Sequence, residues 1–149
     1  MNISTKGQYG LEALLDLAIH SDGELVNIKS IAERQGISEK YLEQIFGVLK
    51  RSGILSSTRG ALGGYRLVES PENITVRQIL NALEGPLSPV DCVVEGKESN
   101  CQRFDFCVTR RFWGRIMEEL NQVADKVTLG DLLDCYMKES PNNNLEYSI

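Results

Sequence analysis

The 149-residue sequence contains a single histidine, His20, and none of its four cysteines form the closely spaced C-x2-4-C pairs typical of structural zinc sites. It has no histidine pair, no nucleotide-binding glycine loop and no catalytic triad. These absences argue against a redox or metal enzyme. No apolar run approaches the ~20 residues of a membrane span, and the N-terminus lacks the charged-then-apolar pattern of a signal peptide. We therefore expect a cytoplasmic protein whose thiols stay reduced.

A net positive charge, the usual mark of a nucleic-acid-binding chain, is also missing. The formal net charge is −5, while 42% hydrophobic and 25% charged residues are typical of a globular domain. The charge is unevenly distributed, however: residues 1–66 carry a net +1 and residues 67–149 a net −6. Residues 40–66 contain five Lys and Arg residues but only one glutamate. This local basic stretch is compatible with a DNA-binding surface.

The first half of the chain has the pattern of three helices. The first is expected from Thr5 to about His20, and its apolar residues cover most of its circumference, so we expect it to be largely buried. Asn27 is a good N-cap for a short second helix, Gly36 suits a tight corner, and Ser38 caps the third helix. Two helices joined by a glycine turn predict a helix-turn-helix.

The third helix and the segment after it separate apolar from polar residues. Leu42, Ile45, Phe46 and Leu49 form the expected inward stripe of the helix. Residues 54–58 and 65–68 then read as two strands around the basic, glycine-rich segment RGALGG, which predicts a β-hairpin wing. The predicted DNA contacts lie on the outward face of the helix and on the wing: Ser38, Glu39, Lys40, Tyr41, Glu43, Gln44, Lys50, Arg51, Arg59 and Gly60.

The second half begins with a capping box, Thr75 with Gln78, which opens a fourth helix. A long helix is expected at residues 108–126, followed by a short one from Thr128. The long helix has a coiled-coil seam with the spacing 3, 4, 3, 4, which predicts pairing with a second copy of the chain. The residues of this predicted dimerisation seam are Trp113, Ile116, Leu120, Val123 and Val127.

These patterns predict a mainly α fold with a small β-hairpin wing, a winged helix-turn-helix followed by a long C-terminal dimerisation helix. The expected organisation is a DNA-binding domain at 1–85, a cysteine-bearing loop at 86–107, dimerisation and terminal helices at 108–138, and a disordered tail at 139–149. The partners expected from it are double-stranded promoter DNA and a second copy of the chain, with no membrane.

The loop contains three cysteines, Cys92, Cys101 and Cys107, in a stretch without hydrophobic periodicity. Thiolates are the natural ligands of iron–sulfur clusters, so these residues are candidate metal ligands. A thiol redox switch and a zinc site stay open as alternatives, because spacing alone does not identify a metal. Cys135 lies in an apolar helical pattern and is expected to be a buried, structural cysteine.

Five segments together resemble the Rrf2 family of bacterial regulators over nearly all of residues 1–137: KGQYGLEALLDLA, ISEKYLEQIF, LSSTRGALGGYRL, LEGPLSPV and TLGDLL. The loop cysteines make the chain most similar to the iron–sulfur cluster regulators of that family, called IscR. This resemblance implies a homodimeric winged-helix repressor with a [2Fe–2S] cluster that reports iron–sulfur supply. It also implies that Glu43 and Gln44 read bases and that Arg59 enters the minor groove.

Two features depart from the IscR pattern. The first two cysteines are nine residues apart, where IscR members have six, and Arg110 stands where those members place the histidine that is the fourth cluster ligand. A guanidinium stays protonated and cannot ligate iron. A nitric-oxide-sensing relative uses a first-helix carboxylate, but the equivalent residue here is Gln8. The fourth ligand is thus unidentified, and the candidate oxygen donors are Glu12, Asp16 and Asp105.

Three alternatives follow from the same residues. The EGPLSPV segment and the wing resemble, at least as closely, a cluster-free family member that regulates cysteine metabolism through a partner enzyme. A metal or redox enzyme lacks the motifs it would need. A pure dimerisation adaptor would leave the basic residues of 40–66 without a role. Salt-dependent binding to promoter DNA separates a regulator from the last two.

Overall fold

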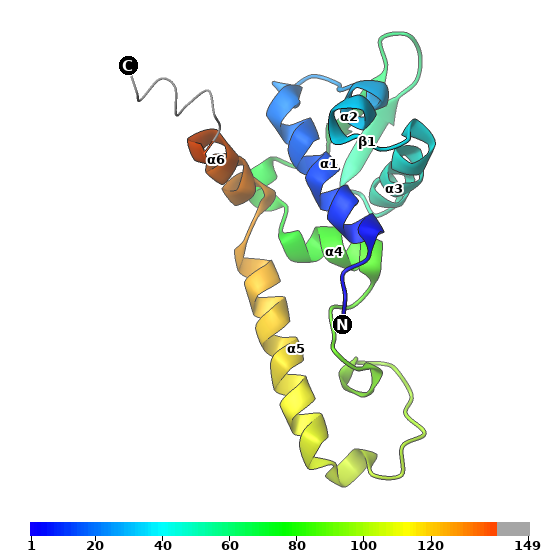
Figure 1. Cartoon of the computed structure of the whole chain (residues 1–149), viewed down its shortest axis with the longest axis vertical. Helices are drawn as coiled ribbons and strands as arrows, with labels where there is room; N and C mark the ends of the chain where they lie inside the picture. Colours follow the sequence, from blue (N-terminus) through cyan, green and yellow to red (C-terminus); the bar gives the residue numbers. More distant parts are fainter. Residues whose placement is uncertain (140–149) are drawn as a thin grey trace.

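A computed structural model describes residues 1–139, so the predicted disordered tail lies outside the described residues except for Glu139. Figure 1 shows a helical domain from which one long helix extends, with a two-stranded hairpin beside the short helices. The elements are α1 (Thr5–Ser21), α2 (Ile28–Gln35), α3 (Glu39–Arg51), β1 (Leu55–Thr58), β2 (Gly64–Leu67), η1 (Pro71–Asn73), α4 (Val76–Glu84), η2 (Asp91–Val93), η3 (Phe104–Phe106), α5 (Val108–Lys126) and α6 (Leu129–Glu139). The winged helix-turn-helix prediction is confirmed.

Residues at the helix ends set the helix boundaries, and most of these caps were predicted. Asp22 ends α1 with a left-handed φ of 43°, and Gly36 makes the corner after α2 with a φ of 67°. The side chain of Ser38 accepts a hydrogen bond from the Tyr41 amide, and the Thr75–Gln78 capping box starts α4. Because each cap satisfies amide groups that the first helical turn leaves free, these short polar motifs fix where the helices begin.

The core lies between α1, α3 and α4. Leu42, Ile45, Phe46 and Leu49 of α3 are each 0% exposed, as their spacing predicts. They pack with Leu14 and the other buried side chains of α1 in one cluster. Burial of leucine, isoleucine and phenylalanine side chains stabilises the fold by roughly 1.5–3 kcal/mol each. The antiparallel hairpin pairs Leu55 with Leu67 and closes one side of this core.

Burial differs from expectation at two places. Helix α1 buries one side, with Ala13, Leu14 and Leu17 in the core, but Tyr9 is 36% exposed and Leu11 and Leu15 are only partly buried. One side of this helix borders an apolar groove that a single chain leaves open. Cys135 is exposed, because α6 buries only its first turn, Leu129 and Gly130.

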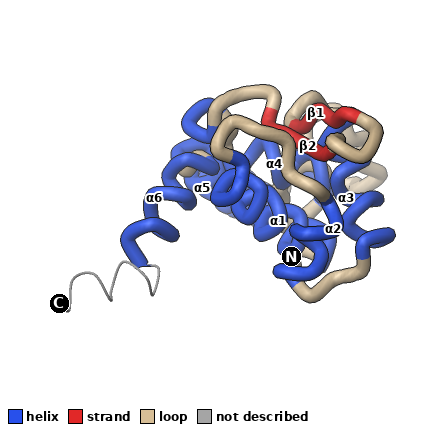
Figure 2. Tube along the Cα trace, turned by 90° about the horizontal axis from the view of Figure 1, so that it is seen from above, coloured by secondary structure: helices blue, strands red, loops and turns tan. Residues whose placement is uncertain are grey.

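Backbone hydrogen bonds join the C-terminal end of α5 to the start of α4. At its C-terminal end, the Val76 amide donates to the carbonyl of Val127 at 2.9 Å, and the Leu129 amide donates to the carbonyl of Ile74 at 2.8 Å. From these contacts α5 extends away from the helical domain, with the cysteine loop at its far end (Figure 1). The turned view shows α6 on the side of the domain away from the hairpin (Figure 2). None of the helices within residues 1–139 is long and apolar enough to cross a membrane.

Candidate nucleic-acid interface and cysteine loop

Helix α3 presents a polar face opposite its buried stripe. Glu39, Lys40, Glu43, Gln44 and Lys50 are all exposed. Their exposure follows from the helical period, since every one of them falls between the apolar positions that the core requires. The predicted DNA-contact residues of this helix therefore share one face that is open to a partner.

Three contacts hold the wing beside α3. The Lys50 Nζ donates to Ser57 Oγ on β1 at 2.6 Å, and the rings of Phe46 and Tyr65 meet edge to face with centroids 5.0 Å apart. In addition, Val26 and Tyr65 exchange two backbone hydrogen bonds of 2.9 Å. The hairpin is thus joined to α3 and to the segment just before α2, which fixes the wing relative to the recognition helix.

A polar cleft lies between the recognition helix and the wing, and five predicted DNA contacts line it: Glu39, Glu43, Lys50, Arg59 and Gly60. Burial of Tyr65, and then the negative charge of Glu43, raise the pKa of the tyrosine hydroxyl. Arg59 is exposed at the start of the wing loop. The sequence predicted the two elements, and the fold brings their residues to one cleft.

Tyr41 and Lys6 extend this surface toward α1. Tyr41 is half-buried, its ring meets Tyr9 edge to face at 6.2 Å, and its hydroxyl lies 3.5 Å from Thr5 Oγ1. Lys6 lines a second groove together with Tyr41, Gln44 and Arg51. Sequence reasoning missed Lys6, because it lies more than thirty residues before the helix-turn-helix residues it joins.

A buried ion pair joins α1 to α2. Asp16 is 5% exposed and accepts hydrogen bonds from Arg34 Nε at 3.0 Å and Nη2 at 2.6 Å, and from Gln35 Nε2 at 3.0 Å. The hydrogen bond to Asp16 raises the pKa of Arg34. Asp16, one of the candidate oxygen donors, thus already has its carboxylate bound by the guanidinium of Arg34 and the amide of Gln35.

The three loop cysteines are free thiols in different local settings. Cys92 lies in η2, Cys101 is exposed, and Cys107 is the N-cap residue of α5. The Sγ atom of Cys107 lies 3.2 Å from Thr109 Oγ1. The hydrogen bond with Thr109, and then one with the backbone of Arg110, lower the pKa of the Cys107 thiol.

Arg110, which occupies the position expected for a histidine ligand, links parts of the loop. Its Nε donates to the carbonyl of Cys92 at 3.1 Å, and its guanidinium lies 3.7 Å above the ring of Phe104. This contact is a cation–π interaction, which a flat arginine makes well. In the part of the chain from residue 1 to 139, no three Cys, His, Asp or Glu side chains are placed to hold a metal ion. The structure thus does not gather Cys92, Cys101 and Cys107.

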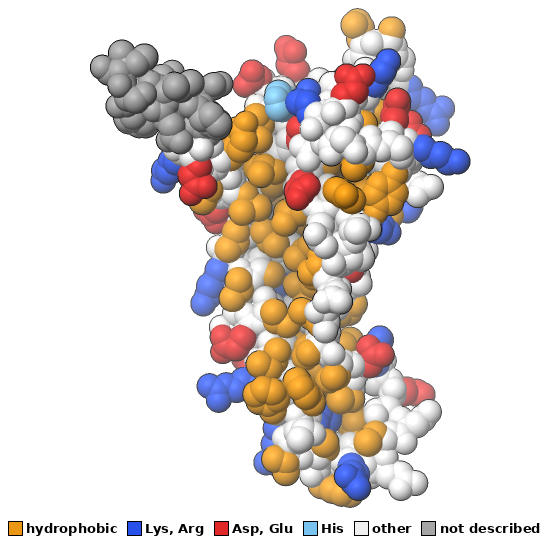
Figure 3. All heavy atoms as spheres, viewed as in Figure 1, with side chains coloured by type: hydrophobic (Ala, Val, Ile, Leu, Met, Phe, Trp, Pro, Cys, Tyr) orange, Lys and Arg blue, Asp and Glu red, His pale blue; other side chains and the backbone are white. Residues whose placement is uncertain are grey.

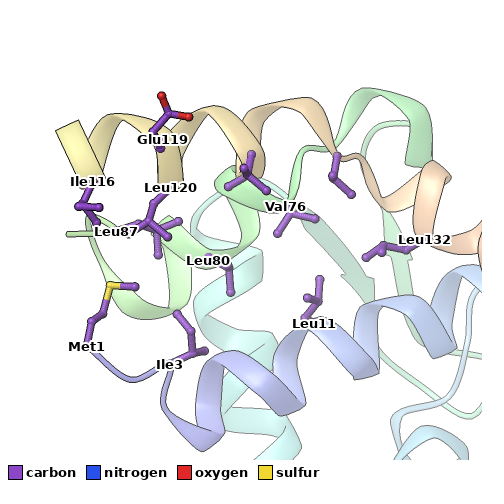
Figure 4. Close-up of a pocket in the computed structure, with 13 residues that line it drawn as sticks. Met1, Ile3, Leu11, Val76, Leu80, Leu87, Ile116, Glu119, Leu120 and Leu132 are labelled. Atoms are coloured by element: carbon purple, nitrogen blue, oxygen red, sulfur yellow. The ribbon is translucent and has the colours of Figure 1, made fainter. Parts of the chain in front are cut away.

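Helix α5 contributes to a large apolar groove of about 560 Å³ (Figure 4). Four of the five predicted seam residues line it: Ile116, Leu120, Val123 and Val127. The groove also includes Met1, Ile3 and Leu11 from the N-terminal segment and α1, and Val76, Leu80, Leu87, Glu119, Ala124 and Leu132. Trp113 instead packs edge to face against Phe112, with centroids 5.0 Å apart. Figure 3 shows hydrophobic side chains in a column along α5.

Comparison with known proteins identifies the family. A model of the Rrf2 family, described as iron-dependent transcriptional regulators, matches residues 3–135. The chain belongs to the Rrf2 family. Protein rrf2 of Nitratidesulfovibrio vulgaris is 41% identical over 133 residues, which are 89% of this chain and 87% of that protein.

Two solved Rrf2-family structures confirm the fold. CymR (YrzC), the global cysteine regulator of B. subtilis, has a TM-score of 0.73 and 40% identity, covering 90% of this chain and 97% of CymR. IscR of T. potens has a TM-score of 0.71 and 42% identity, covering 90% of this chain and 87% of that one. Curated relatives called IscR and CymR are named HTH-type transcriptional regulators, and this Rrf2-family chain is a DNA-binding transcription regulator.

Proposed function

We propose that this protein is a homodimeric repressor that binds promoter DNA with helix α3 and the wing, and whose cysteine loop receives the signal. One observation supports this assignment of the DNA-binding surface. A single polar cleft is lined by Glu39, Glu43, Lys50, Arg59 and Gly60. A recognition helix placed in the major groove needs a neighbouring element that contacts the backbone or minor groove, and the wing supplies it.

Substitution of Arg59 tests this surface. Arg59→Ala is expected to weaken binding to an operator selected from random DNA by roughly tenfold, because it removes a cation that is placed for a phosphate or minor-groove contact. Arg103→Ala, an exposed arginine in the cysteine loop, is the matched control. Fluorescence anisotropy measures the affinity, and sedimentation checks that the dimer remains. Equal affinities of the Arg59→Ala variant and the parent would refute the wing assignment.

The apolar groove supports the homodimer. Its lining is almost entirely hydrophobic, and Val123 is 63% exposed in the single chain. An exposed apolar surface of this kind marks an association site. The seam spacing on α5 favours another α5 as the occupant, and two copies would present two recognition helices to two half-sites.

The first candidate for the signal is a [2Fe–2S] cluster on Cys92, Cys101 and Cys107. In favour of it are three thiolate donors within one loop, the ligand type that such clusters use. The described arrangement does not fit a preformed cluster site, because the three sulfurs do not converge and Arg110 occupies the expected fourth position. A cluster would thus require the loop to rearrange and a ligand from elsewhere.

The second candidate is cluster-free control by thiol oxidation or by a partner enzyme. The loop thiols are free, Cys101 is exposed, and the chain is as similar to the cysteine regulator CymR as to IscR. Oxidation of accessible, partly ionised thiols is a common signal in such regulators. Under this second mechanism, the loop responds either by oxidation of its thiols or by binding the partner enzyme.

An absorption spectrum of protein purified without oxygen separates the two candidates. Broad visible bands with about two iron and two sulfide per chain support the cluster. Replacing Cys92, Cys101 or Cys107 with alanine should then abolish the bands, while Cys135→Ala should leave them unchanged. A colourless protein that stays colourless after reconstitution refutes the cluster and leaves thiol or partner control. DNA binding is measured separately, so its outcome does not depend on this one.

A further inference from the structure

The tip of the wing ends in an apolar side chain that the fold does not use. Leu62 is 94% exposed, more than any other large hydrophobic side chain within residues 1–139. The Gly63 amide donates to the carbonyl of Gly60 at 2.9 Å, which closes a four-residue turn with Ala61 and Leu62 at its corners. An exposed leucine adds nothing to the burial that stabilises the chain, so Leu62 is free to contact a partner of the wing.

The base of the turn packs closely against the rest of the domain, and this packing sets the position of Leu62. A Cβ atom on Gly63 would come within 2.9 Å of the Arg59 carbonyl carbon, and one on Gly64 within 2.8 Å of the Val26 carbonyl carbon. Only glycine allows such close backbone approach at these two positions. Together with the Lys50–Ser57 and Phe46–Tyr65 contacts, this packing holds the apex at a fixed place beside α3.

The surroundings of Leu62 are those of a DNA contact. Arg59 precedes it by three residues in the same loop, and Figure 3 shows hydrophobic atoms at the end of the wing with Lys and Arg side chains nearby. One leucine among glycines is far too small for a protein interface, which buries ~800 Å² on each partner. A DNA minor groove, in contrast, accepts single apolar side chains such as leucine.

We propose that Leu62 enters the minor groove beside Arg59 and packs against the sugars and base edges there, making it a specificity-determining residue of the wing. This inference rests on the proposed DNA-binding role of the wing. The amino group of guanine projects into the minor groove, so an apolar side chain seated on the groove floor disfavours G·C pairs at its contact. Leu62 would therefore add a preference for A·T pairs under the wing.

Variants at Leu62 test the contact on an operator selected with the parent protein. Leu62→Ala and Leu62→Gln should weaken binding roughly five- to twentyfold, and Leu62→Met by no more than about twofold, as expected for loss or retention of a buried apolar side chain. The slope of log affinity against log salt should stay unchanged, since leucine neutralises no phosphate, whereas Arg59→Ala should reduce the slope by about one. Val68→Ala, at the base of the hairpin and 54% exposed, is the matched control.

Single A·T to G·C replacements along the operator locate the contact. At the base pairs under the wing, each replacement should lower the DNA affinity of the parent protein more than it lowers the affinity of Leu62→Ala. If Leu62→Ala binds as the parent does while Arg59→Ala is weakened, the inference is overturned and the wing assignment stands. If Arg59→Ala also binds normally, the wing assignment fails as well. A Leu62→Ala variant that binds DNA weakly because its dimer has dissociated would assign Leu62 to a protein contact and overturn the inference.

Discussion

At the scale of single residues, Asp16 and Arg34 show how a buried charge is retained. The Asp16 carboxylate is 5% exposed, and its hydrogen bonds come from Arg34 and Gln35. An uncompensated buried charge costs several kcal/mol, so the Asp16 carboxylate depends on these partners, which join α1 to α2. This packing sets the first helix of the helix-turn-helix motif.

We predict that Asp16→Asn lowers the free energy of unfolding by about 2 kcal/mol, because the guanidinium loses its charged partner while remaining partly hydrated. Arg34 is 35% exposed, which keeps the cost below that of a fully buried arginine. Asp125→Asn is the control: its pair with Arg77 is exposed on both sides and should contribute less than ~1 kcal/mol. Urea denaturation of both variants measures the difference, and equal losses would contradict the prediction.

Cys107 gives a pH-dependent prediction. Its pKa is lowered first by the hydrogen bond with Thr109, so the thiolate forms at a lower pH than it would without this contact. The rate of iodoacetamide alkylation at Cys107, followed by mass spectrometry, should therefore rise at a lower pH in the parent protein than in Thr109→Val. Identical pH profiles would show that the hydrogen bond does not control the thiol. The other cysteines are replaced with alanine in both proteins.

At the scale of elements, α1 approaches α4 through a glycine. A Cβ atom on Gly10 would collide with the Leu83 side chain and lie 3.2 Å from Ile45 Cγ2. Glu84 at the end of α4 accepts hydrogen bonds from the Ser4 amide and the Gly7 amide, both at 3.0 Å. The end of α4 thus caps the start of α1, and the two helices depend on this close contact.

Two glycine substitutions with the same chemistry should have opposite effects. Gly10→Ala is expected to destabilise the protein by about 1–3 kcal/mol, because the added methyl group overpacks the α1–α4 contact. Gly47→Ala should stabilise it by about 0.5–1 kcal/mol, since alanine favours the helix and the nearest neighbour, Arg51 Nη1 at 3.4 Å, belongs to a flexible side chain. Thermal unfolding compares the stabilities of the two variants. Destabilisation by both substitutions would mean that the gain in helix propensity does not determine the effect at Gly47.

At the scale of the whole molecule, the groove along α5 is an apolar surface that a single chain leaves open. We predict that Val123→Glu converts the proposed dimer to a monomer, because a carboxylate in an apolar interface loses its hydration without gaining a partner. In the single chain this side chain is 63% exposed, so the fold itself should survive. Gln122→Glu places the same charge on the neighbouring exposed position and should leave the dimer intact. Sedimentation equilibrium measures both, and an unchanged dimer in Val123→Glu would remove α5 from the interface.

The elements that could be predicted are those with local causes. Helix α5 spans Val108–Lys126 as predicted, because its amphipathic repeat is continuous over nineteen residues. The capping box of α4, the left-handed Gly36 and the four core residues of α3 were also predicted from short patterns. In contrast, the exposure of Cys135 was not predicted, because an apolar helical pattern does not reveal which of its residues another element covers.

By itself the sequence determined the order of the main helices and the hairpin and their approximate ends, because caps, turns and periodicity act over a few residues. It also determined which face of α3 is polar. Only the tertiary structure decided that the recognition helix and the wing share one cleft, that Asp16 pairs with Arg34, and that the loop sulfurs stand apart. Those outcomes depend on contacts between distant segments, whose geometry is set by the packing of the whole core.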